Sequence, residues 1–270
     1  MVLAGCGGGH SARGGKTSVV ASFYPLAYAA AEVGGSKVAV ANLTPAGVEP
    51  HDLELSPDAV RKIQSANVVL VLGHGFQPQV EAAARQSHGQ VVVLLDTPGL
   101  RRHVNGDPHV WLDPRRYAML ARRIGRVLHD ESRAARMVSR LDELSVKYAH
   151  GLAHCAHHEI VTSHAAFGYL AERYGLQQIS IEGFSPEAEP TPQDLQHVAR
   201  LVRVDHVTTI FFETLVSPKV AKTLARETGT KTAVLDPLEG LTPAAIAHGE
   251  NYFSVMRRNL AVLRKSLGCR

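Results

Sequence analysis

Apolar positions along the first half of the chain alternate between two spacings. Short runs of β-branched apolar residues predict buried strands, and apolar residues three and four positions apart predict helices. Ser56 followed by Pro57 is typical of a helix start. This alternation predicts a parallel sheet with helices on both faces. The expected strands are residues 17–23, 37–43, 67–72 and 91–95, and the expected helices are residues 26–33, 56–66 and 77–86.

The pattern changes in the middle of the chain and then returns. Residues 114–154 give no strand signal and predict two helices that divide near residue 130, the second of them long. We therefore predict an α/β protein of two similar lobes with parallel-type sheets, joined by a long linker helix, with the functional site in the cleft between them. Later strands are expected at residues 159–163, 178–181, 207–212 and 231–235, and helices at residues 165–174, 191–204, 218–228 and 245–267. The expected boundaries are a lipoprotein-type tail at 1–16, a first lobe at 17–131, the linker helix at 132–154 and a second lobe at 155–270.

Composition narrows the functional classes. A chain of 270 residues is long enough for two compact lobes, and its 45% hydrophobic and 20% charged residues are typical of globular proteins. The formal net charge is only +4, and the arginines are scattered rather than gathered with aromatic residues, so no nucleic-acid partner is expected. No apolar run reaches the length of about eighteen residues that would span a bilayer.

Cysteines give two separate signals. Leu3-Ala4-Gly5-Cys6 has the small-residue pattern of a bacterial lipoprotein cleavage site, with Cys6 as the lipidated residue and the glycine-rich residues 7–15 as a flexible tether. The alternative is a glycine-rich tail with a chance cysteine, because the residues before Cys6 lack the charged and apolar parts of a signal peptide. In an exported protein Cys155 and Cys269 are an available disulfide pair, and two buried thiols are the alternative.

Three histidines and one aspartate stand where metal ligands are often placed. His51 and His109 lie in proline-bounded loops, whereas His164 and Asp236 end β-branched runs that predict strands. Strand ends and loops carry the functional side chains of α/β scaffolds. Four nitrogen and oxygen donors from four segments can close a shell around one cation such as zinc. The sequence thus predicts a metal-binding protein.

Other polar residues are assigned weaker roles. Glu213 ends an expected strand and could orient a ligating histidine by accepting a hydrogen bond, and His74 could line the cleft near the metal. A histidine cluster could bind a stray metal, but its helical spacing favours a solvent-exposed helix end. The histidines of this cluster are His150, His154, His157 and His158.

Several motifs together are similar to a known family. The chain resembles the metal-receptor cluster (cluster A-I) of solute-binding proteins that serve bacterial ABC importers of zinc and manganese. This resemblance implies two α/β lobes bridged by a rigid helix and places the family's ligands on His51, His109, His164 and Asp236. The matching segments, which follow the family's order and span nearly the whole chain, are Glu49-Pro50-His51-Asp52-Leu53-Glu54-Leu55-Ser56-Pro57, Asp107-Pro108-His109-Val110-Trp111-Leu112-Asp113-Pro114, Thr162-Ser163-His164-Ala165-Ala166-Phe167-Gly168-Tyr169-Leu170, Ser185-Pro186-Glu187-Ala188-Glu189-Pro190 and Val234-Leu235-Asp236-Pro237-Leu238.

The resemblance implies a high-affinity, extracytoplasmic, membrane-anchored zinc receptor. It would be a monomer that binds one Zn²⁺ and hands it to a membrane permease, without catalysis, because four protein ligands leave no open position for water. The alternatives are a manganese or iron receptor of the same fold, a zinc hydrolase with Asp236 as base, and a structural zinc site in an adhesin-like surface protein. One departure is that only His88 and His103 lie between His74 and His109, where zinc receptors often carry a histidine-rich insertion.

Overall fold

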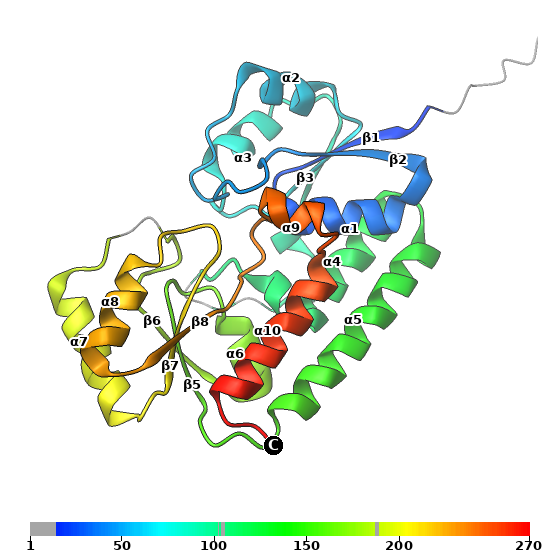
Figure 1. The fold of residues 1–270 in the computed structure, drawn as a ribbon. Coiled ribbons are helices and arrows are strands. Elements are labelled where there is room, and N and C mark those ends of the chain that lie inside the picture. The colour runs from blue at the N-terminus through cyan, green and yellow to red at the C-terminus, as the bar shows by residue number, and fades with distance from the viewer. Residues whose placement is uncertain (1–14, 102, 104–105, 187–188) are drawn as a thin grey trace, which may run out of the picture.

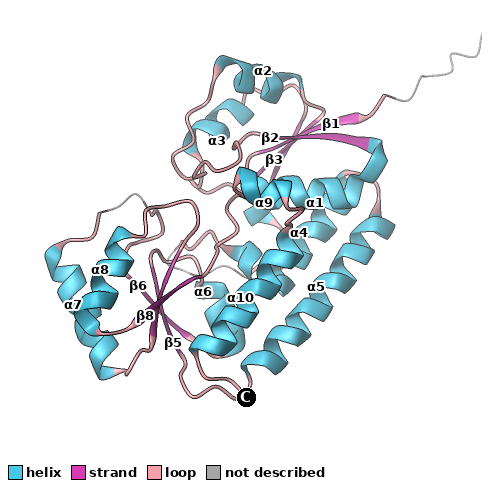
Figure 2. Ribbon diagram, viewed as in Figure 1, coloured by secondary structure: helices cyan, strands magenta, loops and turns pink. Residues whose placement is uncertain are grey.

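Two four-stranded parallel sheets form the centres of the two lobes (Figures 1 and 2). The computed structural model describes residues 15–101, 103, 106–186 and 189–270. The first sheet has the order β2-β1-β3-β4 and the second the order β6-β5-β7-β8, so the two lobes share one topology. The strands are β1 (Thr17–Ala21), β2 (Val38–Asn42), β3 (Val68–Val71), β4 (Gln90–Val93), β5 (Glu159–Thr162), β6 (Gln177–Ser180), β7 (Thr209–Phe212) and β8 (Lys231–Val234). The predicted α/β fold of two similar lobes is confirmed.

Helices cover the sheets and connect the lobes. Their starts follow local chemistry: the Ser56 hydroxyl accepts the Ala59 N–H, and Asp130 accepts the Arg133 N–H at the start of the longest helix. This helix, α5 (Glu131–Leu152), is the expected linker. The other helices are α1 (Tyr24–Gly34), α2 (Pro57–Ser65), α3 (Pro78–Ala84), α4 (Pro114–Val127), α6 (Gly168–Tyr174), α7 (Pro192–Val204), α8 (Lys219–Thr228), α9 (Pro243–Ala247) and α10 (Tyr252–Ser266).

The closing helix predicted over residues 245–267 is wrong as a single element. It is divided into α9 and α10 by a turn in which Gly249 adopts a φ of 71°. Asn251 then caps α10: its side chain accepts the Ser254 N–H, and the Ser254 side chain accepts the Asn251 N–H. The glycine and the asparagine were visible in the sequence, but the apolar spacing continues across them.

The final segments of the chain pack against both halves of the molecule. The buried Trp111 indole donates to the Pro237 carbonyl over 2.8 Å, and the Tyr252 hydroxyl donates to the Trp111 carbonyl over 2.8 Å. A disulfide joins Cys155 to Cys269, the pair available in the sequence, across a separation of 114 residues. The two hydrogen bonds join the first lobe to the final segments of the chain, and the disulfide ties the start of the second lobe to its end. Among the described residues, no helix is long and apolar enough to cross a membrane.

Candidate metal centre

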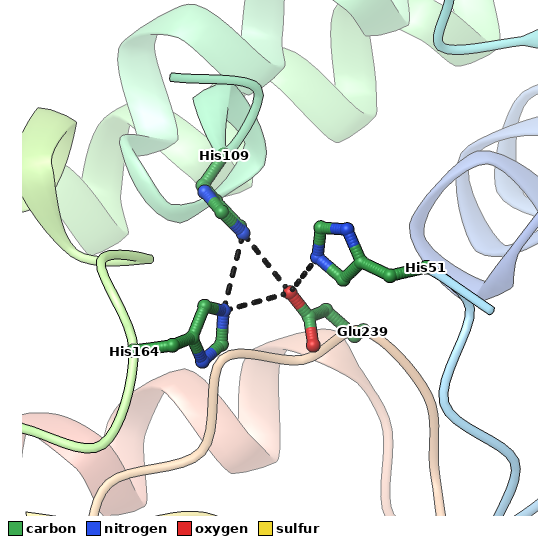
Figure 3. Close-up of side chains that lie close together, drawn as sticks. All are labelled: His51, His109, His164 and Glu239. Atoms are coloured by element: carbon green, nitrogen blue, oxygen red, sulfur yellow. Dashed lines mark hydrogen bonds and ion pairs between the residues drawn. The ribbon is translucent and has the colours of Figure 1, made fainter. Parts of the chain in front are cut away.

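Four side chains from four loops converge between the carboxyl ends of the two sheets (Figure 3). His51 follows β2, and His109 lies in the loop after β4, immediately before the short 3-10 helix Val110–Leu112. His164 comes two residues after β5, and Glu239 lies in the loop after β8. One donor atom from each residue lies within 4.8 Å of the other three. Each lobe therefore supplies two donors, at the strand ends where open α/β sheets bind ligands.

Four of the six separations between the donor atoms are close to those of a tetrahedral zinc site. The Glu239 Oε1 atom lies 3.3 Å from His51 Nε2, 3.1 Å from His109 Nε2 and 3.3 Å from His164 Nε2. The Nε2 atoms of His109 and His164 are 3.3 Å apart. A tetrahedron with metal–donor bonds of about 2.0–2.1 Å has edges of about 3.3–3.4 Å. The four measured separations thus agree with four edges of a zinc tetrahedron.

Carboxylates outside the group orient two of the histidines. The Nδ1 atom of His109 lies 2.8 Å from Asp107 Oδ1, and the Nδ1 atom of His164 lies 2.7 Å from Glu213 Oε1. A carboxylate partner holds the proton on Nδ1 and leaves the Nε2 lone pair facing the metal position. Glu213 therefore contacts His164, as its position at the end of an expected strand suggested. Asp107 has the same relation to His109 and was not predicted.

The Phe76 ring and the Glu49 carboxyl group both contact His51 and position it. Its ring meets the Phe76 ring in an edge-to-face contact with centroids 4.6 Å apart, and its backbone N–H donates to Glu49 Oε1 over 3.1 Å. Burial and the nearby Glu239 raise the pKa of Glu49 to about 9. With a pKa this high Glu49 is protonated at neutral pH, so Glu239 carries the negative charge on this side of the site.

Electrostatics within the group favour a bound positive charge. Burial alone would raise the pKa of Glu239, but His164, His109 and His51 hold it well below its usual value. Burial would lower the pKa of His164, yet Glu239 and Glu213 raise it to about 11. The side chains of His109, His164 and Glu239 are fully buried, and that of His51 is 9% exposed. Protons and a metal ion therefore compete for the same shielded donors.

The structure does not bring Asp236 into this group. Its Oδ1 accepts the Leu238 N–H over 2.8 Å, and its Oδ2 accepts the Thr214 hydroxyl over 3.3 Å. Its backbone is held by Asn259, which accepts the Asp236 N–H and donates to the Asp236 carbonyl. Asp236 thus shapes the turn that presents Glu239, three residues later. The expectation of Asp236 in the donor group is corrected to Glu239.

The comparisons with known proteins agree with this geometry. Residues 19–266 match the family model described as zinc-uptake complex component A, periplasmic. The chain belongs to this family. It is 35% identical to the zinc-binding protein AdcA of Streptococcus pyogenes, over 93% of this chain and 56% of AdcA. It is 31% identical to the high-affinity zinc uptake system protein ZnuA of Bacillus subtilis, over 99% of this chain and 94% of ZnuA.

Solved structures of the family share its fold. The zinc-bound ZnuA-like domain of Streptococcus pneumoniae AdcA is 36% identical, with a TM-score of 0.81 over 94% of this chain and 99% of that domain. The laminin-binding protein Lmb of Streptococcus agalactiae is 31% identical, with a TM-score of 0.85 over 93% of this chain and 99% of Lmb. The chain spans about half the length of the AdcA relatives, so it corresponds to one portion of those proteins.

The remaining predicted residues lie away from the donor group or outside the described residues. His74 is 40% exposed and lies with its Nε2 atom 2.8 Å from Asp96 Oδ1, so it is not part of the donor group. Cys6, the expected lipidation site, lies outside the described residues. Glu239, Asp107 and Glu49 were missed, although all three are acidic residues within three positions of a predicted ligand.

Proposed function

We propose that this member of the family is a high-affinity extracytoplasmic zinc receptor that passes its ion to the permease of an ABC importer. The observation that supports this most directly is the shielded set of three imidazole nitrogens and one carboxylate oxygen, in which four of the separations fit a zinc tetrahedron. Three nitrogen donors and one oxygen donor in low coordination suit zinc better than manganese, which prefers more oxygen ligands. The zinc-bound structure of the similar AdcA domain supports the same choice.

A receptor explains the site better than an enzyme does. Catalytic zinc sites keep one position open for water or substrate, whereas four protein donors fill the tetrahedron here. The hydrolase alternative needs Asp236 as a base near the metal, but its oxygens bind Leu238 and Thr214 instead. A closed site of this kind binds and releases an ion without reacting with it.

Membrane attachment and the permease complete the proposal. We infer that Cys6 is lipidated and that the glycine-rich residues 7–15 tether a monomeric receptor near its permease. The relative from Streptococcus pneumoniae is named a zinc-binding lipoprotein, which supports this inference. After detergent-free lysis at high salt, native protein is expected in the membrane fraction and the Cys6→Ser variant in the soluble fraction. Unmodified Cys6 on native protein in the soluble fraction would contradict the anchor.

Metal analysis and one ligand variant test the zinc site. Protein purified without added metal is expected to contain one zinc ion per chain, removable by a chelator. His109→Ala is expected to weaken zinc binding by at least two orders of magnitude, since it removes one of four donors. His88→Ala, which changes an exposed histidine outside the donor group, is the matched control and should bind as the wild type does. Wild-type zinc affinity in the His109 variant would show that the site is wrongly assigned.

A further inference from the structure

Two stretches of the chain contain no acidic residue; the first has one basic residue, Lys147, and the second has five. Residues 144–158 and 251–270 together carry six of the 29 Lys and Arg residues and none of the 25 Asp and Glu residues. The rest of the chain therefore has 23 basic against 25 acidic residues. The histidine cluster at His150, His154, His157 and His158 falls within the first stretch. The net positive charge of the protein arises from these two stretches.

The fold places the two stretches side by side. The second half of α5 runs along α10 (Figure 1), and the Cys155–Cys269 disulfide joins the segments that follow the two helices. Between the helices lies a groove of about 500 Å³. A Cβ atom at Gly151 would lie 3.1 Å from Arg264 Cδ and from Leu260 Cδ1, so the glycine permits this close approach. The groove is lined by Val146, Lys147, His150, Gly151, Arg257, Leu260, Ala261 and Arg264.

The charges of this surface are exposed and unbalanced. Five of its basic side chains are exposed and form no ion pair within the described part of the chain. By contrast, Arg258, which lies on α10, pairs with Glu250 and approaches Asp236. We name the five the basic surface: Lys147, Arg257, Arg264, Lys265 and Arg270. A second cavity, of about 470 Å³, is lined by His157, Lys231 and Lys265 among other residues, again with no acidic residue.

We propose that the basic surface binds anionic phospholipid headgroups of the membrane. Guanidinium and ammonium groups bind phosphate oxygens, and juxtamembrane clusters of basic residues are attracted to anionic lipid. The groove adds an apolar floor at Leu260 and at Val146, which is 47% exposed, beside its basic rim. Such a combination suits a headgroup together with the first carbons of its acyl chains. The spread of charge over two helices and the chain end fits a broad surface rather than a single small anion.

The inference adds a second membrane contact to the lipid anchor proposed at Cys6. A basic patch near a lipid anchor adds electrostatic attraction to an anionic membrane. The tether would hold the protein near the bilayer, and the basic surface would orient it there. Neither step depends on zinc, so the two proposals can fail independently.

Vesicle flotation tests this inference. The protein used is the whole chain with Cys6→Ser, a substitution that removes the lipidation site. The vesicles contain phosphatidylcholine alone or equal parts of phosphatidylcholine and phosphatidylglycerol, at low salt without zinc. We expect binding only to the phosphatidylglycerol vesicles and its loss at high salt. Each basic residue near an anionic surface contributes about fivefold to binding. The triple variant Lys147→Glu, Arg257→Glu, Arg264→Glu should therefore bind at least about a hundredfold more weakly.

The matched control reverses the charge of three exposed basic residues outside the basic surface, so it has the same net charge as the first triple variant. It carries Arg126→Glu, Arg200→Glu and Lys219→Glu, and it should retain most of the vesicle binding. Unchanged zinc affinity in both variants shows that each is folded. Equal losses in both variants, or equal binding to both kinds of vesicle, would overturn the proposal. Failure of the Cys6→Ser chain, with its basic surface intact, to bind either kind of vesicle would also overturn the proposal. In that case, binding of a polyglutamate peptide would assign the surface to an acidic polypeptide.

Discussion

Two matched amide substitutions, Glu239→Gln and Asp236→Asn, identify the fourth metal ligand. Both residues lie in the loop after β8, and each substitution removes one negative charge with almost no change in shape. Glu239 Oε1 lies within 3.3 Å of all three histidine Nε2 atoms, whereas Asp236 accepts hydrogen bonds from Leu238 and Thr214. The structure therefore predicts that only the change at Glu239 strongly weakens zinc binding.

The expected loss of zinc affinity follows from the number of donors. Structural zinc sites bind with about 10–16 kcal/mol, so one of four donors accounts for roughly 3–4 kcal/mol, or two to three orders of magnitude in affinity. Glu239→Gln is expected to lose about a hundredfold, because its amide oxygen remains a weak neutral donor. Asp236→Asn keeps an acceptor for the Leu238 N–H and should stay within about tenfold of the wild type. Asp236→Ala leaves that buried N–H unpaired and should lower the free energy of unfolding by about 1–3 kcal/mol.

The assay is competition for zinc with a chelator of known affinity, with thermal unfolding in the presence and absence of zinc as a second readout. A tightly bound ion raises the unfolding temperature in proportion to the logarithm of its concentration relative to Kd. Wild-type affinity in Glu239→Gln, together with a hundredfold loss in Asp236→Asn, would refute the reasoning and restore Asp236 as the ligand.

Three further outcomes are expected. His164→Glu replaces a nitrogen donor with oxygen, so calorimetry with both ions should show a smaller preference for zinc over manganese; an unchanged ratio would argue against His164 as a ligand. Glu213→Gln removes the charged partner of the His164 ring and should weaken zinc binding by about ten- to a hundredfold, and wild-type affinity would show that the partner is dispensable. Replacing Cys155 and Cys269 by Ala should lower the free energy of unfolding by about 4–5 kcal/mol in the chain-entropy model, and urea curves that coincide with those of the oxidised protein would contradict it.

Much of the fold could be predicted from the sequence because the central strands of both sheets, β1, β3, β5 and β7, are short, rich in apolar residues and largely buried. Such runs are separated by helical spacing throughout both lobes, and this alternation specifies parallel sheets. The exception is the break at residues 248–251, where apolar residues on either side keep the helical spacing and a single φ of 71° at Gly249 ends α9. Periodicity cannot detect a turn that leaves the spacing unchanged.

The three histidines of the donor group were predictable, and its acidic member was not. A residue that ends a strand lies at the sheet edge, which favours Asp236 over a residue in the following loop. The chain, however, turns at Leu238, whose φ is 57°, and the Asp236 carboxylate stabilises this turn through the Leu238 N–H. The turn carries Glu239 into the cleft. Sequence spacing gives the position of a strand end but not the direction in which the next three residues project.

The repeated topology explains why the site must lie between the lobes. Each lobe contributes only two donors, and in both lobes the loop after the fourth strand supplies one of them, His109 in the first and Glu239 in the second. The atoms of this pair are 3.1 Å apart, which requires that the lobes be held at one spacing. A hydrogen bond joins the lobes beside the site, because the Trp111 indole donates to the Pro237 carbonyl. Trp111 lies two residues after His109, and Pro237 lies two residues before Glu239. The two loops that supply this pair of donors therefore also join the two lobes beside the site.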